Sequence, residues 1–164
     1  MGSGFEFKCS KCSKVYGIYL GIGMLYPTVY KETVEKITKG TFGEEWKQFY
    51  EDTENVAVDV ENRVFICPDC GSWKQEQGMS LYVADNEYAL KDVKKGLPVF
   101  YGDDSIPAMF GQKPEYRLVK EYGHKCDKCG SKMREATEKE MWDLPCPKCG
   151  TRPDTDSISI MNWD

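Results

Sequence analysis

The sequence predicts an α+β fold of two small β-rich modules, each held by four cysteines, with a helical insertion in the first. Three observations lead to this prediction. The 164 residues suffice for two units of about 80 residues, a size at which a core is marginal without a metal or crosslink. All eight cysteines stand in pairs separated by two residues. Strand-like alternation flanks these pairs, and the longest helical periodicity lies in residues 27–52.

The elements of the first module follow from local patterns. Residues 15–22 are apolar and favour a strand. Pro27-Thr28 opens a helix that ends at Gly40, and a second helix covers about residues 43–52. Residues 56–66 alternate around a short turn, which predicts a hairpin leading into the second cysteine pair.

The remaining elements are shorter. Residues 72–84 are predicted as strand, 87–95 as a helix stopped by a glycine, and 116–125 as strand. A capping-box pattern at residues 137–140 opens one helical turn, and residues 157–163 alternate as a final strand.

The predicted domains follow one another along the chain. Residues 1–96 form the first module, with its helical insertion at about 27–52. The Pro/Gly-rich stretch 97–115 is a linker or docking loop, and residues 116–164 form the second module.

The cysteine spacing predicts metal ligation. The pairs are Cys9/Cys12, Cys67/Cys70, Cys126/Cys129 and Cys146/Cys149. A Cys-x-x-Cys turn points both thiolates at one ion, and two such turns complete a tetrahedral Cys₄ shell of the kind that zinc prefers. Disulfides are the alternative, but a bond across two residues would constrain little of the chain. We therefore expect two Zn²⁺ per chain, with all eight cysteines as ligands.

The pairs are of two kinds that alternate. The first and third have the pattern K-C-x-K-C, and the second and fourth have C-P-x-C-G. The economical assignment places the first four cysteines on one ion and the last four on the other. Ser13 stands where such a turn commonly has a glycine, because that position needs a left-handed backbone.

On these motifs each half resembles a zinc ribbon, and residues 124–150 are similar to ribbons of nucleic-acid-handling and adaptor proteins. The whole chain resembles uncharacterised bacterial proteins with two such ribbons, a resemblance that implies no activity. Rubredoxins use related pairs around iron, so an iron redox protein is an alternative. Rubredoxins usually have an aromatic residue where this chain has Ser131.

Charge favours a protein partner over nucleic acid. The formal net charge is −5, and residues 41–112 hold six basic against fourteen acidic side chains. Such a surface repels a phosphate backbone. A nucleic-acid partner remains an alternative, because residues 116–134 place basic and aromatic side chains together. The basic ones are Lys120, Lys125, Lys128, Lys132 and Arg134. Lysines beside the cysteine pairs also offset thiolate charge, which explains several of them without a partner.

No catalytic motif is present. The chain lacks a nucleophile elbow, a phosphate loop and an evident acid–base pair, so a non-catalytic protein is favoured over an enzyme. His124 is expected to be structural, and Asp103-Asp104 to form a turn. Thiolates held by metal indicate a reducing compartment, the cytoplasm. The uncharged stretch 15–28 is too short to cross a bilayer, so no membrane association is expected.

Overall fold

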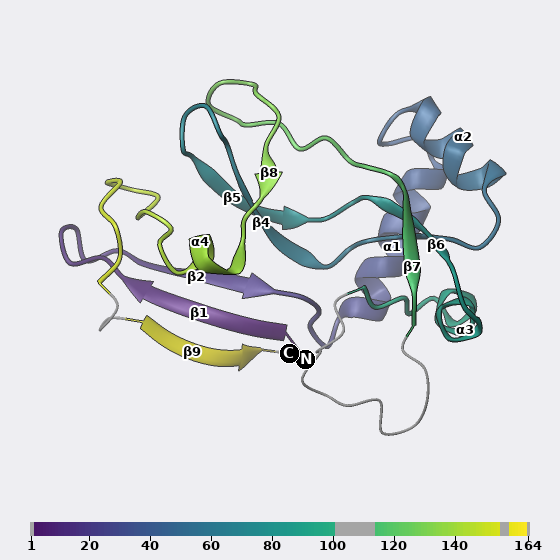
Figure 1. The fold of residues 1–164 in the computed structure, drawn as a ribbon, viewed down its shortest axis with the longest axis horizontal. Coiled ribbons are helices and arrows are strands. Elements are labelled where there is room, and N and C mark those ends of the chain that lie inside the picture. The colour runs from purple at the N-terminus through teal and green to yellow at the C-terminus, as the bar shows by residue number, and fades with distance from the viewer. Residues whose placement is uncertain (1, 101–113, 155–157, 164) are drawn as a thin grey trace. The chain divides into compact units, whose positions relative to one another are not determined.

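The computed structural model describes residues 2–100, 114–154 and 158–163 (Figure 1). Within these ranges the chain forms nine strands and four helices, which confirms the α+β class. It divides into two compact units, each built from separated segments. The knuckle unit comprises Met1–Gly23, Asn62–Gln77 and Gly123–Asp164. The helical unit comprises Met24–Glu61 and Gly78–Tyr122.

The knuckle unit contains two three-stranded antiparallel sheets of the same design (Figure 1). The first has the order β2-β1-β9, from β1 (Gly2–Lys8), β2 (Val15–Leu20) and β9 (Ile158–Trp163). The second has the order β5-β4-β8, from β4 (Asn62–Ile66), β5 (Trp73–Gln77) and β8 (Arg134–Glu135). In each sheet two strands form a hairpin whose turn is a cysteine pair. A third strand, from far along the chain, pairs with the first strand of that hairpin.

The core of the knuckle unit lies between these two sheets. Phe7 of β1 and Tyr16 and Ile18 of β2 are buried, and they pack with Val64 of β4 and with Leu144. The rings of Phe7 and Tyr16 stack with centroids 5.1 Å apart. Replacing Phe7 by alanine would cost about 3–5 kcal/mol, because the cavity would open where both sheets meet.

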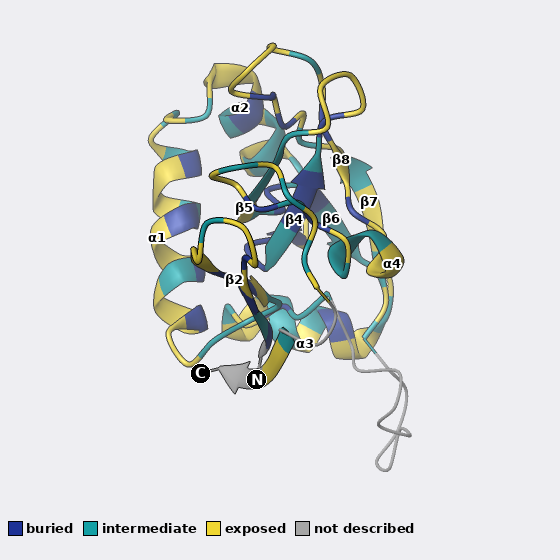
Figure 2. Ribbon diagram, turned by 90° about the vertical axis from the view of Figure 1, so that its left-hand side faces the viewer, coloured by how far each residue is buried: buried dark blue, intermediate teal, exposed yellow. Residues whose placement is uncertain are grey.

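In its described residues the helical unit has one sheet and three helices. The sheet has the order β3-β6-β7, from β3 (Val56–Val58), β6 (Leu81–Ala84) and β7 (Tyr116–Lys120). The helices are α1 (Tyr26–Thr38), α2 (Glu44–Asp52) and α3 (Glu87–Lys95). Buried residues of α1 follow one side of that helix, as Figure 2 shows, and include Tyr26, Tyr30 and Ile37 at helical spacing.

Local sequence explains where the shorter helices begin and end. The Asn86 side chain accepts a hydrogen bond from the N–H of Ala89, which caps α3, and Gly96 ends this helix with φ of 69°. In the knuckle unit, Thr137 and Glu140 form the predicted capping box at the start of α4 (Glu138–Met141). These helices confirm the positions that the sequence predicts.

Several strand predictions are wrong in their pairing. The predicted hairpin over residues 56–66 does not form, since β3 pairs with β6 and β4 pairs with β5. The predicted strand 72–84 is split into β5 and β6, which belong to different sheets, with Met79 at φ of 61° between them. Strand β1 was not predicted. The first two errors concern the choice of partner strand, which local alternation does not encode.

The two units are interleaved along the chain, whereas the sequence predicts consecutive domains 1–96 and 116–164. The pairing of β1 with β9 joins segments from both predicted domains, and so does that of β4 with β8. Most of the predicted linker 97–115, with Asp103-Asp104, lies outside the described residues.

Candidate metal centres

Each cysteine pair folds into the same tight turn, here called a knuckle. The N–H of the first cysteine donates to the carbonyl five residues later, at 2.8–2.9 Å. The carbonyl of that cysteine accepts from the N–H four residues later, at 2.8–3.0 Å. This last position has a left-handed backbone in all four knuckles, with φ of 57° at Ser13, 67° at Gly71, 77° at Gly130 and 74° at Gly150. The prediction that Ser13 occupies a glycine position is confirmed.

The four knuckles meet in two clusters. The outer cluster contains Cys9, Cys12, Cys146 and Cys149. The inner cluster contains Cys67, Cys70, Cys126 and Cys129. In each cluster the sulfur atoms all lie within 4.8 Å of one another, and none of the eight cysteines is in a disulfide.

The sulfur separations suit one ion per cluster. Across the knuckles of the outer cluster, the Sγ atoms of Cys9 and Cys149 are 3.5 Å apart, and those of Cys12 and Cys146 are 3.7 Å apart. The inner cluster has 3.4 Å from Cys67 to Cys129 and 3.6 Å from Cys70 to Cys126. A tetrahedral site with Zn–S distances of about 2.3 Å has edges of about 3.8 Å. The clusters therefore fit a four-thiolate ion.

The predicted sharing of ions is wrong. The first knuckle meets the fourth, and the second meets the third, so the inner cluster is nested within the chain segment that the outer cluster closes. The cause is strand pairing, because β9 lies beside β1 and β8 lies beside β4. Each cluster still combines one K-C-x-K-C knuckle with one C-P-x-C-G knuckle. The alternation was therefore compatible with both arrangements.

Two aromatic side chains hold the fourth knuckle, which belongs to the outer cluster. The Tyr16 hydroxyl donates to the carbonyl of Leu144 at 3.0 Å, and the Trp73 indole N–H donates to that of Pro145 at 2.7 Å. Burial raises the pKa of Tyr16 to about 12, so its hydroxyl stays a donor even in alkaline solution. Both carbonyls immediately precede Cys146, and these contacts fix the approach of this knuckle to the cluster.

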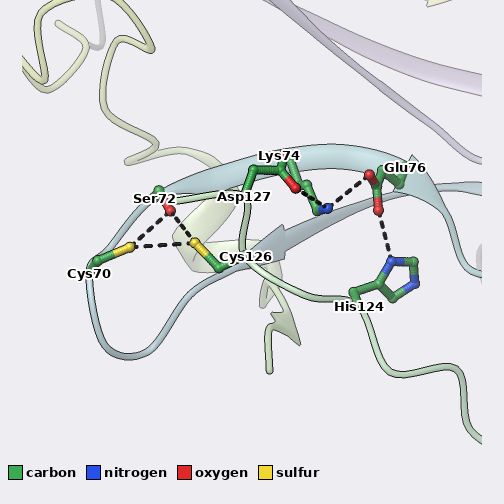
Figure 3. A network of polar contacts seen from close by, with 7 residues as sticks. All are labelled: Cys70, Ser72, Lys74, Glu76, His124, Cys126 and Asp127. Carbon is green, nitrogen blue, oxygen red and sulfur yellow. Dashed lines mark hydrogen bonds and ion pairs between the residues drawn. The ribbon is translucent and has the colours of Figure 1, made fainter. Parts of the chain in front are cut away.

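Hydroxyl groups also contact the sulfur atoms. Ser72 Oγ lies 3.0 Å from the Sγ atoms of both Cys70 and Cys126 (Figure 3). The Ser72 hydroxyl and the backbone N–H of Cys129 lower the pKa of Cys126 to about 6. Thr151, through its hydroxyl and its N–H, lowers the pKa of Cys149 to about 6 in the outer cluster. Donors of this kind stabilise thiolates, the form that binds metal.

Ser72 and the alternate residues Lys74 and Glu76 of β5 hold the third knuckle and the segment just before it (Figure 3). Ser72 contacts Cys126, Lys74 forms an ion pair with Asp127 at 3.2 Å, and Glu76 accepts from His124 Nδ1 at 2.9 Å. The buried His124 ring also stacks on Phe65, with centroids 3.6 Å apart. His124 lies outside both groups of potential ligands, as expected for a structural histidine.

The two clusters differ in exposure. In the outer cluster Cys9 and Cys146 are buried, and Cys12 and Cys149 are half-buried against the core around Phe7. In the inner cluster Cys67 and Cys126 are buried, but Cys70 and Cys129 are exposed. The buried apolar residues around the inner cluster are few among the described residues, namely Phe65 and Met133 with the two buried cysteines.

The chemistry of the donors suits zinc. Four thiolates form a soft, closed shell that leaves no coordination position for a substrate, as in structural zinc sites. Sequence reasoning missed the supporting residues Ser72, Thr151, Tyr16 and Trp73. The first two were detectable, because the second, third and fourth knuckles all continue as C-G-S or C-G-T. The aromatic donors act through tertiary contacts that no local pattern reveals.

The basic residues of 116–134 are only partly available to a partner. Lys120 Nζ lies 2.6 Å from Glu45 of the helical unit. Arg134 of the knuckle unit forms two hydrogen bonds with Glu140, at 2.8 and 2.5 Å. The side chains of Lys125 and Lys128 are exposed.

The helical unit contains an apolar groove of about 480 Å³. Its walls include Tyr30 and Val34 of α1, Tyr50 of α2, Val56 of β3 and Leu97. The charged residues that line it are Lys31, Glu35 and Lys95. Two lysines stand against one glutamate, and Glu35 also forms an ion pair with Lys39 at 3.7 Å, so the charge of the lining is positive on balance.

Comparisons with family models, with curated proteins and with solved structures gave no match to this chain. Of the helices in the described ranges, none combines the length and the apolar character that a bilayer span requires.

Proposed function

We propose that this is a non-catalytic zinc protein in which two structural Cys₄ sites, each in a zinc ribbon, stabilise a scaffold for a protein partner. The observation that carries the proposal is the pair of closed four-thiolate clusters. Structural zinc sites of this kind contribute folding energy directly and leave the ion no free position for chemistry. In each proposed ribbon a hairpin and a distant strand supply the two knuckles.

Elemental analysis and native mass spectrometry test this proposal directly. Protein purified without chelator should contain two zinc ions per chain. Removal by a strong chelator should abolish the native circular dichroism signal, and added zinc should restore it. One ion, no ion, or full structure without metal would contradict the proposal.

The alternative is a rubredoxin-like iron protein, since iron binds the same four thiolates. An Fe–Cys₄ protein is red and has a reversible one-electron potential, whereas the zinc protein is colourless. The protein should be expressed with both metals supplied, and its visible absorption then distinguishes the iron protein from the zinc protein.

A protein partner is favoured over nucleic acid because two of the five basic residues suggested for phosphate contact already face carboxylates. These are Lys120 with Glu45 and Arg134 with Glu140. Fluorescence anisotropy with duplex DNA and single-stranded RNA at physiological salt should give no binding. Micromolar binding that K128E/K132E/R134E abolishes would instead favour nucleic acid.

The groove of the helical unit is a surface that suits such a partner. Its apolar walls would accept an apolar side chain, and Lys31 and Lys95 would attract flanking carboxylates. A photoreactive residue at Val34 should crosslink a partner segment that is acidic and apolar. The same residue at Glu32, which is exposed on α1 outside the groove, is the control. Equal crosslinking from both positions would exclude the groove.

A further inference from the structure

We propose that the inner cluster is an oxidation site for hydroperoxides, at which Cys70 and Cys129 form a disulfide and release the bound zinc. The proposal rests on the proposed function, because it requires zinc in both clusters. Its basis is the difference in exposure between two clusters that share the same knuckle geometry and the same four-thiolate composition.

Exposure determines which thiolates an oxidant reaches. Cys70 and Cys129 are exposed, whereas no cysteine of the outer cluster is. The half-buried Cys12 and Cys149 pack against the core that contains Phe7, Tyr16 and Leu144. Susceptibility to oxidation follows thiolate character and solvent access, so the inner cluster should react first. Zinc holds all eight sulfurs as thiolates, which leaves access as the main difference.

The geometry also supplies the second sulfur. Cys70 and Cys129 come from different knuckles, and their Sγ atoms are 3.7 Å apart. A sulfenic acid formed on either one therefore has a thiolate beside it. A disulfide needs about 2.05 Å between the sulfurs, which the two knuckles can reach by closing over the space that the ion leaves.

The reaction balances with hydrogen peroxide as oxidant. One thiolate attacks the peroxide, the O–O bond breaks, and a sulfenic acid forms. The second thiolate then attacks that sulfur, and the S–S bond forms as the oxygen leaves. Overall two thiolates lose two electrons, and one peroxide with two protons becomes two water molecules. Only Cys67 and Cys126 remain as ligands, so the inner zinc is lost.

The test is peroxide titration of the zinc-loaded protein with a chromogenic chelator present, followed by mass-spectrometric mapping of alkylated and oxidised cysteines. One of the two zinc ions should leave first, with a Cys70–Cys129 disulfide and an intact outer cluster. Dithiothreitol and zinc should restore the original protein. Release of both ions together, release of the outer ion first, or a disulfide within the outer cluster would overturn the proposal.

Two matched variants complete the test. C12S removes a ligand of the outer cluster, and the zinc that remains should stay sensitive to peroxide. C70S removes a ligand of the inner cluster, and the zinc that remains should resist. If either variant is unstable, the alkylation rates of native wild-type protein give the same comparison, with Cys70 and Cys129 expected to react first. Zinc content before peroxide treatment tests the proposed function separately. A protein with fewer than two zinc ions at that point contradicts the proposed function, whereas the order of zinc release tests the oxidation site.

Discussion

Ser13 has the left-handed backbone that glycine has in the other three knuckles. A residue other than glycine pays about 1–2 kcal/mol for this conformation, a cost that glycine avoids. An unfolded glycine is more flexible, however, and ordering it on folding costs about 0.5–1 kcal/mol more, which cancels part of that gain. We therefore expect Ser13→Gly to stabilise the zinc-loaded protein by about 0.5 kcal/mol in urea unfolding. Gly71→Ala is the converse change. An added Cβ there meets nothing within 4 Å, so its destabilisation, about 1 kcal/mol, is purely conformational. A loss of stability in Ser13→Gly would contradict this account.

Ser72 and Thr151 allow the support of each cluster to be measured separately. Ser72→Ala removes the hydroxyl that lowers the pKa of Cys126 to about 6, so that pKa should rise toward its ordinary value of 9.0. Protons compete with zinc for a thiolate below its pKa. On acidification the variant should therefore lose the inner ion at a higher pH than the wild-type protein does. Loss of such a supporting contact typically weakens metal binding by about 10–100-fold. Thr151→Ala should do the same at the outer cluster, and each variant controls for the other in competition titrations with a chelator.

At the scale of elements, helix α3 offers a change far in sequence from any cysteine. Asn86→Ala removes its cap and should destabilise the helical unit by about 1 kcal/mol, whereas Asn86→Asp retains an acceptor and should be nearly neutral. Amide hydrogen exchange in α3 should report the change, with the zinc content still at two ions. Unchanged exchange in Asn86→Ala would show that the cap contributes little.

The elements also indicate what local sequence can specify. Helices α1, α2 and α3 were predictable because their periodicity and end signals are local. Strands β3 and β4 were both expected, but their mutual hairpin was not found, because pairing depends on which face each strand buries. The first knuckle was likewise predictable from its motif, and strand β1, which delivers it, was not. The alternation in β1 covers only Phe5 to Lys8, and two glycines before it shorten the pattern to four residues.

At the scale of the whole molecule, the nested arrangement of the clusters predicts how double variants behave. Cys9→Ser/Cys146→Ser removes two ligands of one cluster and should leave one tightly bound zinc. Cys9→Ser/Cys67→Ser removes one ligand from each cluster and should weaken both sites. The consecutive arrangement expected from sequence gives the opposite result. Native mass spectrometry of the two variants distinguishes them.

The cysteines of the two clusters were predictable as candidate ligands, and the way in which they group was not. The spacing of the eight cysteines identifies knuckles because the turn is local. Partner choice depends on β9 lying beside β1, a contact between residues more than a hundred and fifty positions apart. Since each cluster takes one knuckle of each kind, no residue type within the motifs marks the correct partner.

Nesting also has a consequence during synthesis of the chain. Cys9 and Cys12 emerge first, but their partners Cys146 and Cys149 follow more than a hundred residues later, a delay on the order of ten seconds at ordinary rates of translation. In that interval the next knuckle to appear carries Cys67 and Cys70, which has the right composition to complete a site with the first. The consecutive pairing is thus the one that a growing chain meets earliest. The native protein forms only if the first knuckle stays unpaired until the fourth knuckle is made, or later exchanges the second knuckle for the fourth.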